Sequence, residues 1–131
     1  MLMKKIALLF SSDTYANKLQ QLLMQKTDNN IDIVDINGAK QLDDYTILVL
    51  DAHLGNIKSD FQGLELHNEI RKKGKKLKVI AYSWLNKKQL VSAGAYFNQD
   101  NNNLFWQKDY QQSVLFQFPI SINTLLQELK I

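Results

Sequence analysis

The sequence predicts an α/β protein in which a five-stranded parallel sheet is covered by helices on both faces. Two observations support this fold class. Short apolar runs that suit buried strands alternate along the 131 residues with segments whose apolar residues repeat at helical spacing. The connections between these segments are short, as expected where a helix follows each strand. A chain of this length buries one core and divides poorly into two, so we expect a single domain over residues 1–131.

The first strand and the first helix are expected between residues 5 and 26. Residues 5–10 are a short apolar run. Three side chains that cap helices follow it directly, namely Ser11, Ser12 and Asp13. The expected helix then has an apolar face made of Tyr15, Leu19, Leu22 and Leu23.

The second and third strands are expected over residues 31–36 and 46–50. Only nine residues separate them, whereas a parallel crossover needs a dozen or more and usually contains a helix. The second helix is therefore expected to be short or missing. Asp51 follows the third strand directly.

In the second half, residues 64–73 are expected to form a helix that ends at Gly74, and residues 78–83 the fourth strand. A further helix is expected over residues 86–93, with Gly94 as its stop. The asparagine-rich residues 98–103 are expected to be an exposed loop.

Two segments are candidates for the fifth strand, residues 104–106 and residues 114–118. The second is preferred, because Pro119 and Ser121 then introduce a terminal helix with an apolar face of Ile122, Leu125, Leu126 and Leu129. The whole pattern predicts a flavodoxin-like, doubly wound sheet of order 2-1-3-4-5, whose ligand crevice lies beyond the carboxyl ends of the strands. Asp51, Ser83 and residues 10–13 would face that crevice.

Composition narrows the range of functions. Without cysteine the chain has no disulfide and no thiolate metal site. The apolar residues 6–10 are too few for a membrane span or a secretory signal, so we expect a cytoplasmic protein with no membrane partner. The net charge of +3 comes largely from residues 71–78, which lack aromatic residues for base stacking and suit a solvated helix C-terminus. A nucleic-acid partner is therefore not expected.

The sequence lacks the motifs of two enzyme classes and of a zinc site. The sequence contains neither a Gly-x-Ser-x-Gly elbow nor a glycine-rich phosphate loop. His53 and His67 are far apart in sequence and have no clustered acids or second histidine beside them, so a zinc site is not expected.

Three segments resemble the receiver domains of response regulators, the CheY-like family, and the resemblance can be followed over most of the chain. They are residues 47–51, ending in Asp51, residues 63–66, beginning with Gly63, and residues 79–83, ending in Ser83. The resemblance implies two-component signal transduction, with a place in a phosphorelay. It also implies that Asp51 is the phosphoacceptor and Ser83 the switch hydroxyl.

The sequence departs from the family where the chemistry takes place. Phe10 and Ser11 align with the acidic pair that holds Mg²⁺ in receivers, and Phe118 aligns with the lysine that neutralises the phosphoryl group. Phosphoryl transfer depends on these countercharges, and Mg²⁺ is held through carboxylates. We therefore expect a degenerate receiver, a pseudo-receiver, that is not an enzyme, has no catalytic residue, binds no cofactor and is not efficiently phosphorylated.

Alternatives remain open for Asp51. In an atypical phospho-accepting response regulator, Asp51 and Asp13 would hold Mg²⁺, and Asp60 or Lys108 would have to replace the missing groups. In a structural role, Asp51 would accept N–H bonds from the loop that follows it. A flavodoxin-like small-ligand-binding domain or enzyme is a third possibility and would need a deep pocket above Asp51.

Aromatic residues concentrate in the last third of the chain, where receivers have their partner-binding and dimerisation face. Large aromatic side chains that remain exposed tend to supply binding energy at protein interfaces. The expected function is therefore protein–protein interaction, with a histidine kinase, another signalling protein or a second copy of the chain as partner. The candidate interaction face comprises Trp84, Phe105, Trp106, Phe116 and Phe118.

Overall fold

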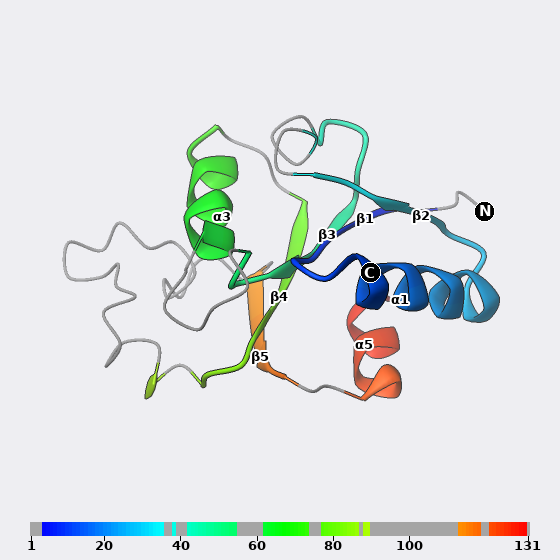
Figure 1. The fold of residues 1–131 in the computed structure, drawn as a ribbon. Helices are drawn as coiled ribbons and strands as arrows, with labels where there is room; N and C mark the ends of the chain where they lie inside the picture. Colours follow the sequence, from blue (N-terminus) through cyan, green and yellow to red (C-terminus); the bar gives the residue numbers. More distant parts are fainter. Residues whose placement is uncertain are drawn as a thin grey trace.

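The computed structural model describes residues 4–35, 38, 42–54, 62–73, 77–86, 88–89, 113–118 and 121–130. Within them lie five strands and three helices (Figure 1). In chain order these are β1 (Lys5–Leu9), α1 (Asp13–Lys26), β2 (Asn30–Ile33), β3 (Ile47–Asp51), α3 (Gln62–Lys72), β4 (Lys78–Ser83), β5 (Ser113–Gln117) and α5 (Ile122–Glu128).

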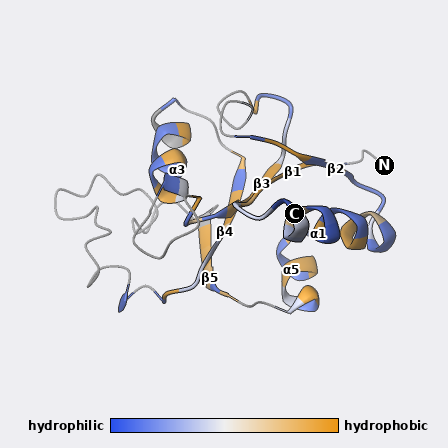
Figure 2. Cartoon of the chain, in the orientation of Figure 1, coloured by the Kyte–Doolittle hydropathy of each residue, from blue (hydrophilic) through white to orange (hydrophobic). Residues whose placement is uncertain are grey.

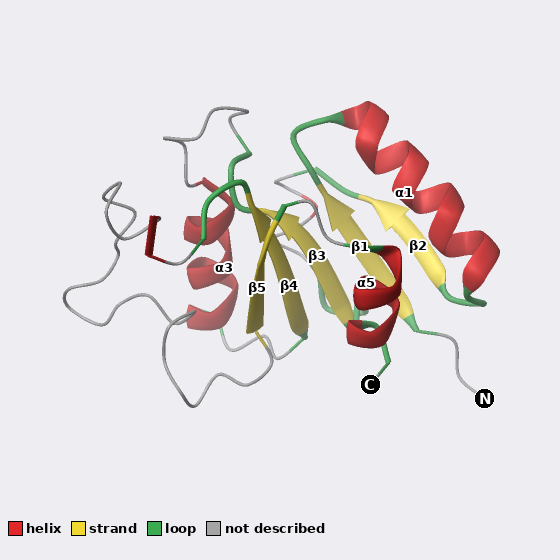
Figure 3. Cartoon of the chain, turned by 90° about the horizontal axis from the view of Figure 1, so that it is seen from below, coloured by secondary structure: helices red, strands yellow, loops and turns green. Residues whose placement is uncertain are grey.

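The five strands form one parallel sheet in the order β2-β1-β3-β4-β5, which confirms the predicted topology (Figure 3). The segment preferred for the fifth strand is the one that pairs with β4. The competing residues 104–106 lie outside the described residues, as do the asparagine-rich loop and residues 87 and 90–93 of the helix expected over residues 86–93. Of the nine residues expected to hold a stunted second helix, residues 37 and 39–41 are outside them too.

Helices cover the sheet on both faces, with α3 on one side and with α1 and α5 on the other (Figure 1). Side chains of a strand point alternately to its two faces. Accordingly, Leu48 and Leu50 of β3 pack with the α3 side, whereas Ile47 and Val49 pack with α1 and α5. Because both faces are covered, the central strands are apolar at nearly every position between their ends rather than at every second one.

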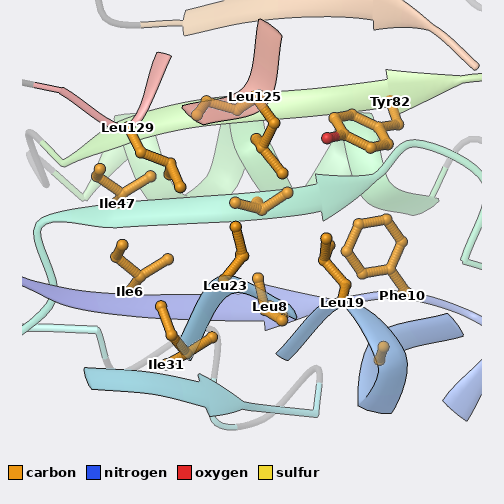
Figure 4. Packing of buried hydrophobic residues seen from close by; sticks show 13 residues of the cluster. Ile6, Leu8, Phe10, Leu19, Leu23, Ile31, Ile47, Tyr82, Leu125 and Leu129 are labelled. Carbon is orange, nitrogen blue, oxygen red and sulfur yellow. The ribbon is translucent and has the colours of Figure 1, made fainter. Parts of the chain in front are cut away.

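Hydrophobic residues concentrate in the strands, while much of α1 is hydrophilic (Figure 2). One face of α1 is nevertheless buried through Ala16, Leu19 and Leu23. Leu125 and Leu129, at the end of the chain, complete the same cluster on this side of the sheet (Figure 4). None of the helices in the described ranges is long and apolar enough to cross a membrane.

A serine is the N-cap of each helix on this face of the sheet, α1 and α5. Ser12 is the N-cap of α1 and accepts from the backbone N–H of Tyr15 at 3.2 Å. Of the three caps that the sequence offered, Asp13 is instead the first helical residue, where its charge favours the positive end of the helix dipole. Ser121 is the N-cap of α5, as predicted, and accepts from Thr124 N at 3.1 Å.

Two lysines hold the C-terminal end of α5 against the amino-terminal edge of the sheet. Lys4 Nζ donates to Leu129 O at 2.8 Å, and Lys78 Nζ donates to Glu128 O at 2.7 Å. Lys78 also pairs with the Glu128 carboxylate at 2.9 Å. These contacts satisfy carbonyls that a helix end leaves open and place positive charge at its negative end. The last lysine of the basic cluster therefore has a structural role.

Candidate functional site

Asp51 ends β3 at the carboxyl edge of the sheet and is only 9% exposed. Both of its carboxylate oxygens accept hydrogen bonds from the chain. Oδ2 accepts from Ser11 N at 3.1 Å and from Ser11 Oγ at 2.8 Å. Oδ1 accepts from His53 N at 2.8 Å, which is the loop contact expected for a structural carboxylate. Because β1 pairs in parallel with β3, Ser11, two residues after the end of β1, lies beside the acid.

Ser83 ends the neighbouring strand β4 and is buried beside His53. Its Oγ lies 2.7 Å from His53 Nε2 and accepts from Leu85 N at 3.0 Å. From the sequence, His53 was assessed only as a possible metal ligand, and its contact with Ser83 was not predicted. The available signal was its position, two residues after a strand-end acid, because a polar ring there must find a partner once the loop is buried.

Gly63 is needed because α3 starts against the end of β3. Its N–H donates to Ala52 O at 3.1 Å. A Cβ at this position would lie 1.9 Å from the Asp51 carbonyl oxygen and 2.7 Å from Ala52 Cα. Backbone atoms leave no room for any side chain, so glycine fixes how closely α3 approaches the acid.

A cavity of about 220 Å³ lies above Asp51. Its polar lining comes from Ser11, Ser12, Asp51 and Ser83. The rest of the lining is aromatic and consists of Phe10, Tyr15, Tyr82, Trp84 and Phe118. Thus Phe10 and Phe118, which align with charged groups in the resembled family, both line this cavity.

The described residues do not fit a magnesium site. Phe10 has no ligand atom, and the Ser11 hydroxyl already donates to Asp51. Asp13 lines a second cavity of about 610 Å³ together with Asp35. Within the described ranges no group of three or more His, Cys, Asp or Glu residues is arranged to hold a metal ion. Asp60 and Lys108, the other replacements considered, lie outside those ranges.

Two tyrosines in the cavity wall are hard to ionise. Burial raises the pKa of the Tyr15 phenol, and the negative charge of Asp51 raises it further. Burial also raises the pKa of Tyr82, with a smaller contribution from Tyr15. The Tyr82 hydroxyl is directed back along β4 and has no hydrogen-bond partner among the residues described (Figure 4). Both groups are therefore neutral walls at physiological pH.

The candidate interaction face is partly open. Trp84 is 51% exposed, and Phe116 and Phe118 are half-buried. The rings of Trp84 and Phe118 are in contact, with their centroids 4.6 Å apart. Phe105 and Trp106 lie outside the described residues.

The chain is similar to known proteins in its three-dimensional structure. No family model matches the sequence. No curated protein matches it either. Among solved structures, the chain is similar to the signal receiver domain of an HD domain-containing protein from Pseudomonas fluorescens, with 19% identity, a TM-score of 0.67, and 98% of this chain and 85% of that one covered.

Two more receivers give the same result. For the signal receiver domain of a DNA-binding response regulator from Colwellia psychrerythraea the identity is 16% and the TM-score 0.67, with 97% and 95% of the two chains covered. For a response regulator receiver protein from Pseudoalteromonas atlantica the values are 17% and 0.65, with 95% and 92% covered. The strand order, the two helical layers and these similarities together give one conclusion: the chain has the CheY-like fold of response-regulator receiver domains.

Proposed function

We propose that this chain is a degenerate receiver domain that signals by binding another protein and is not efficiently phosphorylated on Asp51. The observation that carries the proposal is the hydrogen bonding of the acid. Asp51 is nearly buried, and its two oxygens already accept three bonds from Ser11 and His53. Oδ2, which accepts two bonds from Ser11, would have to lose one of them before it could attack a phosphodonor.

The groups that would stabilise the transferring phosphoryl group are also missing from the described residues of the cavity lining. Phe10 and Phe118 cannot bind a metal ion or neutralise an anion. Removing one electrostatic partner of a transition state commonly costs about a hundredfold in rate. Losing both the metal ligands and the cation leaves Asp51 a poor phosphoacceptor.

Ser83 is restrained as well. A switch hydroxyl must be free to move toward a phosphorylated aspartate, but Ser83 Oγ contacts both His53 Nε2 and Leu85 N. Moving it would leave a buried imidazole nitrogen and a backbone N–H without this partner, which is costly. This restraint supports a fixed rather than a phosphorylation-dependent conformation.

The partner surface that we propose centres on Trp84. Its indole is half exposed and lies against the Phe118 ring at a tilt of 42°, so the pair presents a large apolar contact. Aromatic residues of this kind supply much of the binding energy at interfaces. Gln117 Nε2 donates to Trp84 O at 3.3 Å and links the loop after β4 to β5.

The size of the cavity above Asp51 argues against a nucleotide or flavin bound directly over the acid. Pockets for drug-sized ligands and cofactors begin at about 300 Å³, whereas the cavity above Asp51 has about 220 Å³.

Phosphorylation is tested with acetyl phosphate and Mg²⁺, followed by intact-mass measurement. We expect no adduct on the wild-type chain, while an active receiver treated in the same solution gains one phosphoryl group. The double variant Ser11→Asp, Phe118→Lys restores two of the family's groups and is expected to show more adduct than the wild type. A wild-type adduct that Asp51→Asn abolishes would refute the proposal and support an atypical phosphoacceptor.

The partner surface is tested by comparing two exposed apolar residues. We expect Trp84→Ala to abolish capture of a histidine kinase or other signalling protein that the wild type captures. Met24→Ala, which removes a similarly exposed side chain from α1, should leave capture unchanged. Sedimentation of the purified chain tests whether a second copy is the partner. Equal capture by both variants would move the interface away from Trp84.

A further inference from the structure

We infer that the cavity above Asp51 binds a small organic cation of the alkylated ammonium class. The inference goes beyond the proposed function, because it concerns a ligand rather than the protein partner. It rests on that function in one respect, since it requires the Asp51 carboxylate to remain unmodified.

Four aromatic rings in the cavity lining contact one another in turn and so form a closed circuit of ring contacts. The ring centroids of Phe10 and Tyr15 are 5.0 Å apart, those of Tyr15 and Phe118 5.3 Å, those of Phe118 and Tyr82 5.6 Å, and those of Tyr82 and Phe10 5.7 Å. Neighbouring rings are inclined by 61° to 71°. Trp84 extends the circuit from Phe118. Pairs at such angles pack edge to face, and all of these rings contribute to the cavity lining, so aromatic surface lies close to the Asp51 carboxylate.

Within its described lining, the cavity also carries one negative charge with no cation beside it. Asp51 is the acid in its described lining, and that lining contains no lysine or arginine. The donors bound to Asp51 are neutral, namely a hydroxyl and two backbone N–H groups. They orient the carboxylate without cancelling its charge. An anion would therefore be repelled, whereas a cation would be attracted both by Asp51 and by the rings.

The chemistry of the walls selects among cations. A strongly hydrated ion such as Mg²⁺ needs several oxygen ligands, which the aromatic walls do not offer. An ammonium group that carries alkyl substituents is weakly hydrated and apolar at its surface, and aromatic side chains recognise such groups through cation–π attraction. This attraction strengthens as the group leaves water. Apolar walls beside one carboxylate therefore match an alkylated ammonium better than a bare metal ion.

The volume agrees with this choice. At about 220 Å³, the cavity has room for an ammonium head with its alkyl groups but lies below the range of cofactor-sized pockets, which begins at about 300 Å³. Two sources share this chemistry: a free quaternary ammonium compound and the trimethylated side chain of a lysine in a peptide.

The test uses choline as the probe and 3,3-dimethylbutan-1-ol, its uncharged isostere, as the matched control. Binding is followed by Trp84 fluorescence in a Trp106→Phe chain. We expect a saturable change with choline in the millimolar range or tighter and a response at least tenfold weaker to the isostere. A peptide with trimethyllysine, compared with the same peptide carrying unmodified lysine, distinguishes the two sources.

Variants assign the binding to this cavity. Asp51→Asn preserves the shape of the side chain and removes its charge, so the affinity for choline should fall about tenfold, as expected when one close charge partner is lost. Tyr15→Leu should weaken binding as well, whereas Met24→Ala should not change it. Circular dichroism confirms that each variant is folded. Equal responses to choline and its isostere, no saturable response in the folded wild type, or undiminished binding by Asp51→Asn would each overturn the inference.

The choline titration and the phosphodonor experiment test separate claims, so one claim can be refuted while the other stands. A phosphoryl adduct on Asp51 would refute the proposed function while leaving the titration of the unmodified chain to be read by itself. The absence of choline binding would leave the partner surface at Trp84 untouched.

Discussion

The imidazole of His53 and the hydroxyl of Ser83 are joined across two strands, with Nε2 2.7 Å from Oγ. His53 belongs to the loop after β3, and Ser83 is the last residue of β4. Their contact restrains the loop after β3 beside the cavity that Ser83 lines. Since His53 N also donates to Asp51, the position of the acid depends on the same pair.

Ser83→Ala is therefore expected to lower the free energy of unfolding by about 1–2 kcal/mol, because two buried groups lose a hydrogen-bond partner. Urea denaturation followed by circular dichroism measures the change. Asn123→Ala, at an exposed position of α5, should remain within about 0.5 kcal/mol of the wild type. Similar losses in the two variants would contradict the role assigned to Ser83.

Gly63→Ala is expected to destabilise the fold more than Ser83→Ala, by on the order of 3 kcal/mol, because a Cβ would overlap the backbone of β3 and force α3 away from it. Thermal unfolding gives the shift. Glu69→Ala, at an exposed position of the same helix, controls for the general effect of alanine in α3. A Gly63→Ala chain as stable as the control would mean that α3 does not start where the structure has it.

Tyr82→Phe is expected to leave the stability unchanged or to raise it by about 1 kcal/mol. The Tyr82 hydroxyl is buried, and the described residues offer it no hydrogen-bond partner, so removing it relieves a desolvation cost. Chemical denaturation of both proteins checks the sign. A clear loss of stability would show that the hydroxyl has a partner in the folded chain.

Tyr45 is expected to keep its proton in strongly alkaline solution. Burial, followed by the 2.7 Å hydrogen bond that its hydroxyl donates to Asp32, raises its pKa to about 12 from the ordinary value of 10.0. The folded chain then holds a proton that the unfolded chain has lost. This contribution to stability is complete below pH 10.0 and disappears as the pH rises through about 12.

Absorbance titration at the phenolate band measures this ionisation in the wild type and in Tyr45→Phe, whose difference isolates the Tyr45 phenol. Asp32→Asn should bring the pKa down toward the ordinary value. A difference spectrum that titrates near pH 10 in the wild type would contradict the hydrogen bond.

Much of the sheet was predictable because its strands are buried on both faces. Residues 47–51 and 78–83 are nearly continuous apolar runs, and such runs leave little choice of element between short connections. The choice of β5 depended on local chemistry as well, since Ser121 marks the start of α5. The identity of the α1 cap was less certain, because three adjacent residues have capping side chains.

The site was predictable only in part. Strand ends place Asp51 and Ser83 at one edge of the sheet, and this follows from topology. The partners of these residues do not follow from topology. His53 reaches Ser83 through the path of a loop, and Phe10 and Phe118 line one cavity although more than a hundred residues separate them in sequence. Neither arrangement has a periodic signature, so three-dimensional packing was needed to reveal an aromatic cavity where the sequence indicated only missing charges.

The lysine contacts at the C-terminal end of α5 have a practical consequence for labelling or immobilising the protein. Lys4 and Lys78 bind that helix at the amino-terminal edge of the strands, so residues 4 and 130 both lie there, opposite the carboxyl edge that carries Asp51 (Figure 3). A fluorophore or an immobilising tether attached at either position would leave the aromatic rings accessible to solutes. Surface-based and solution-based assays should therefore report the same behaviour.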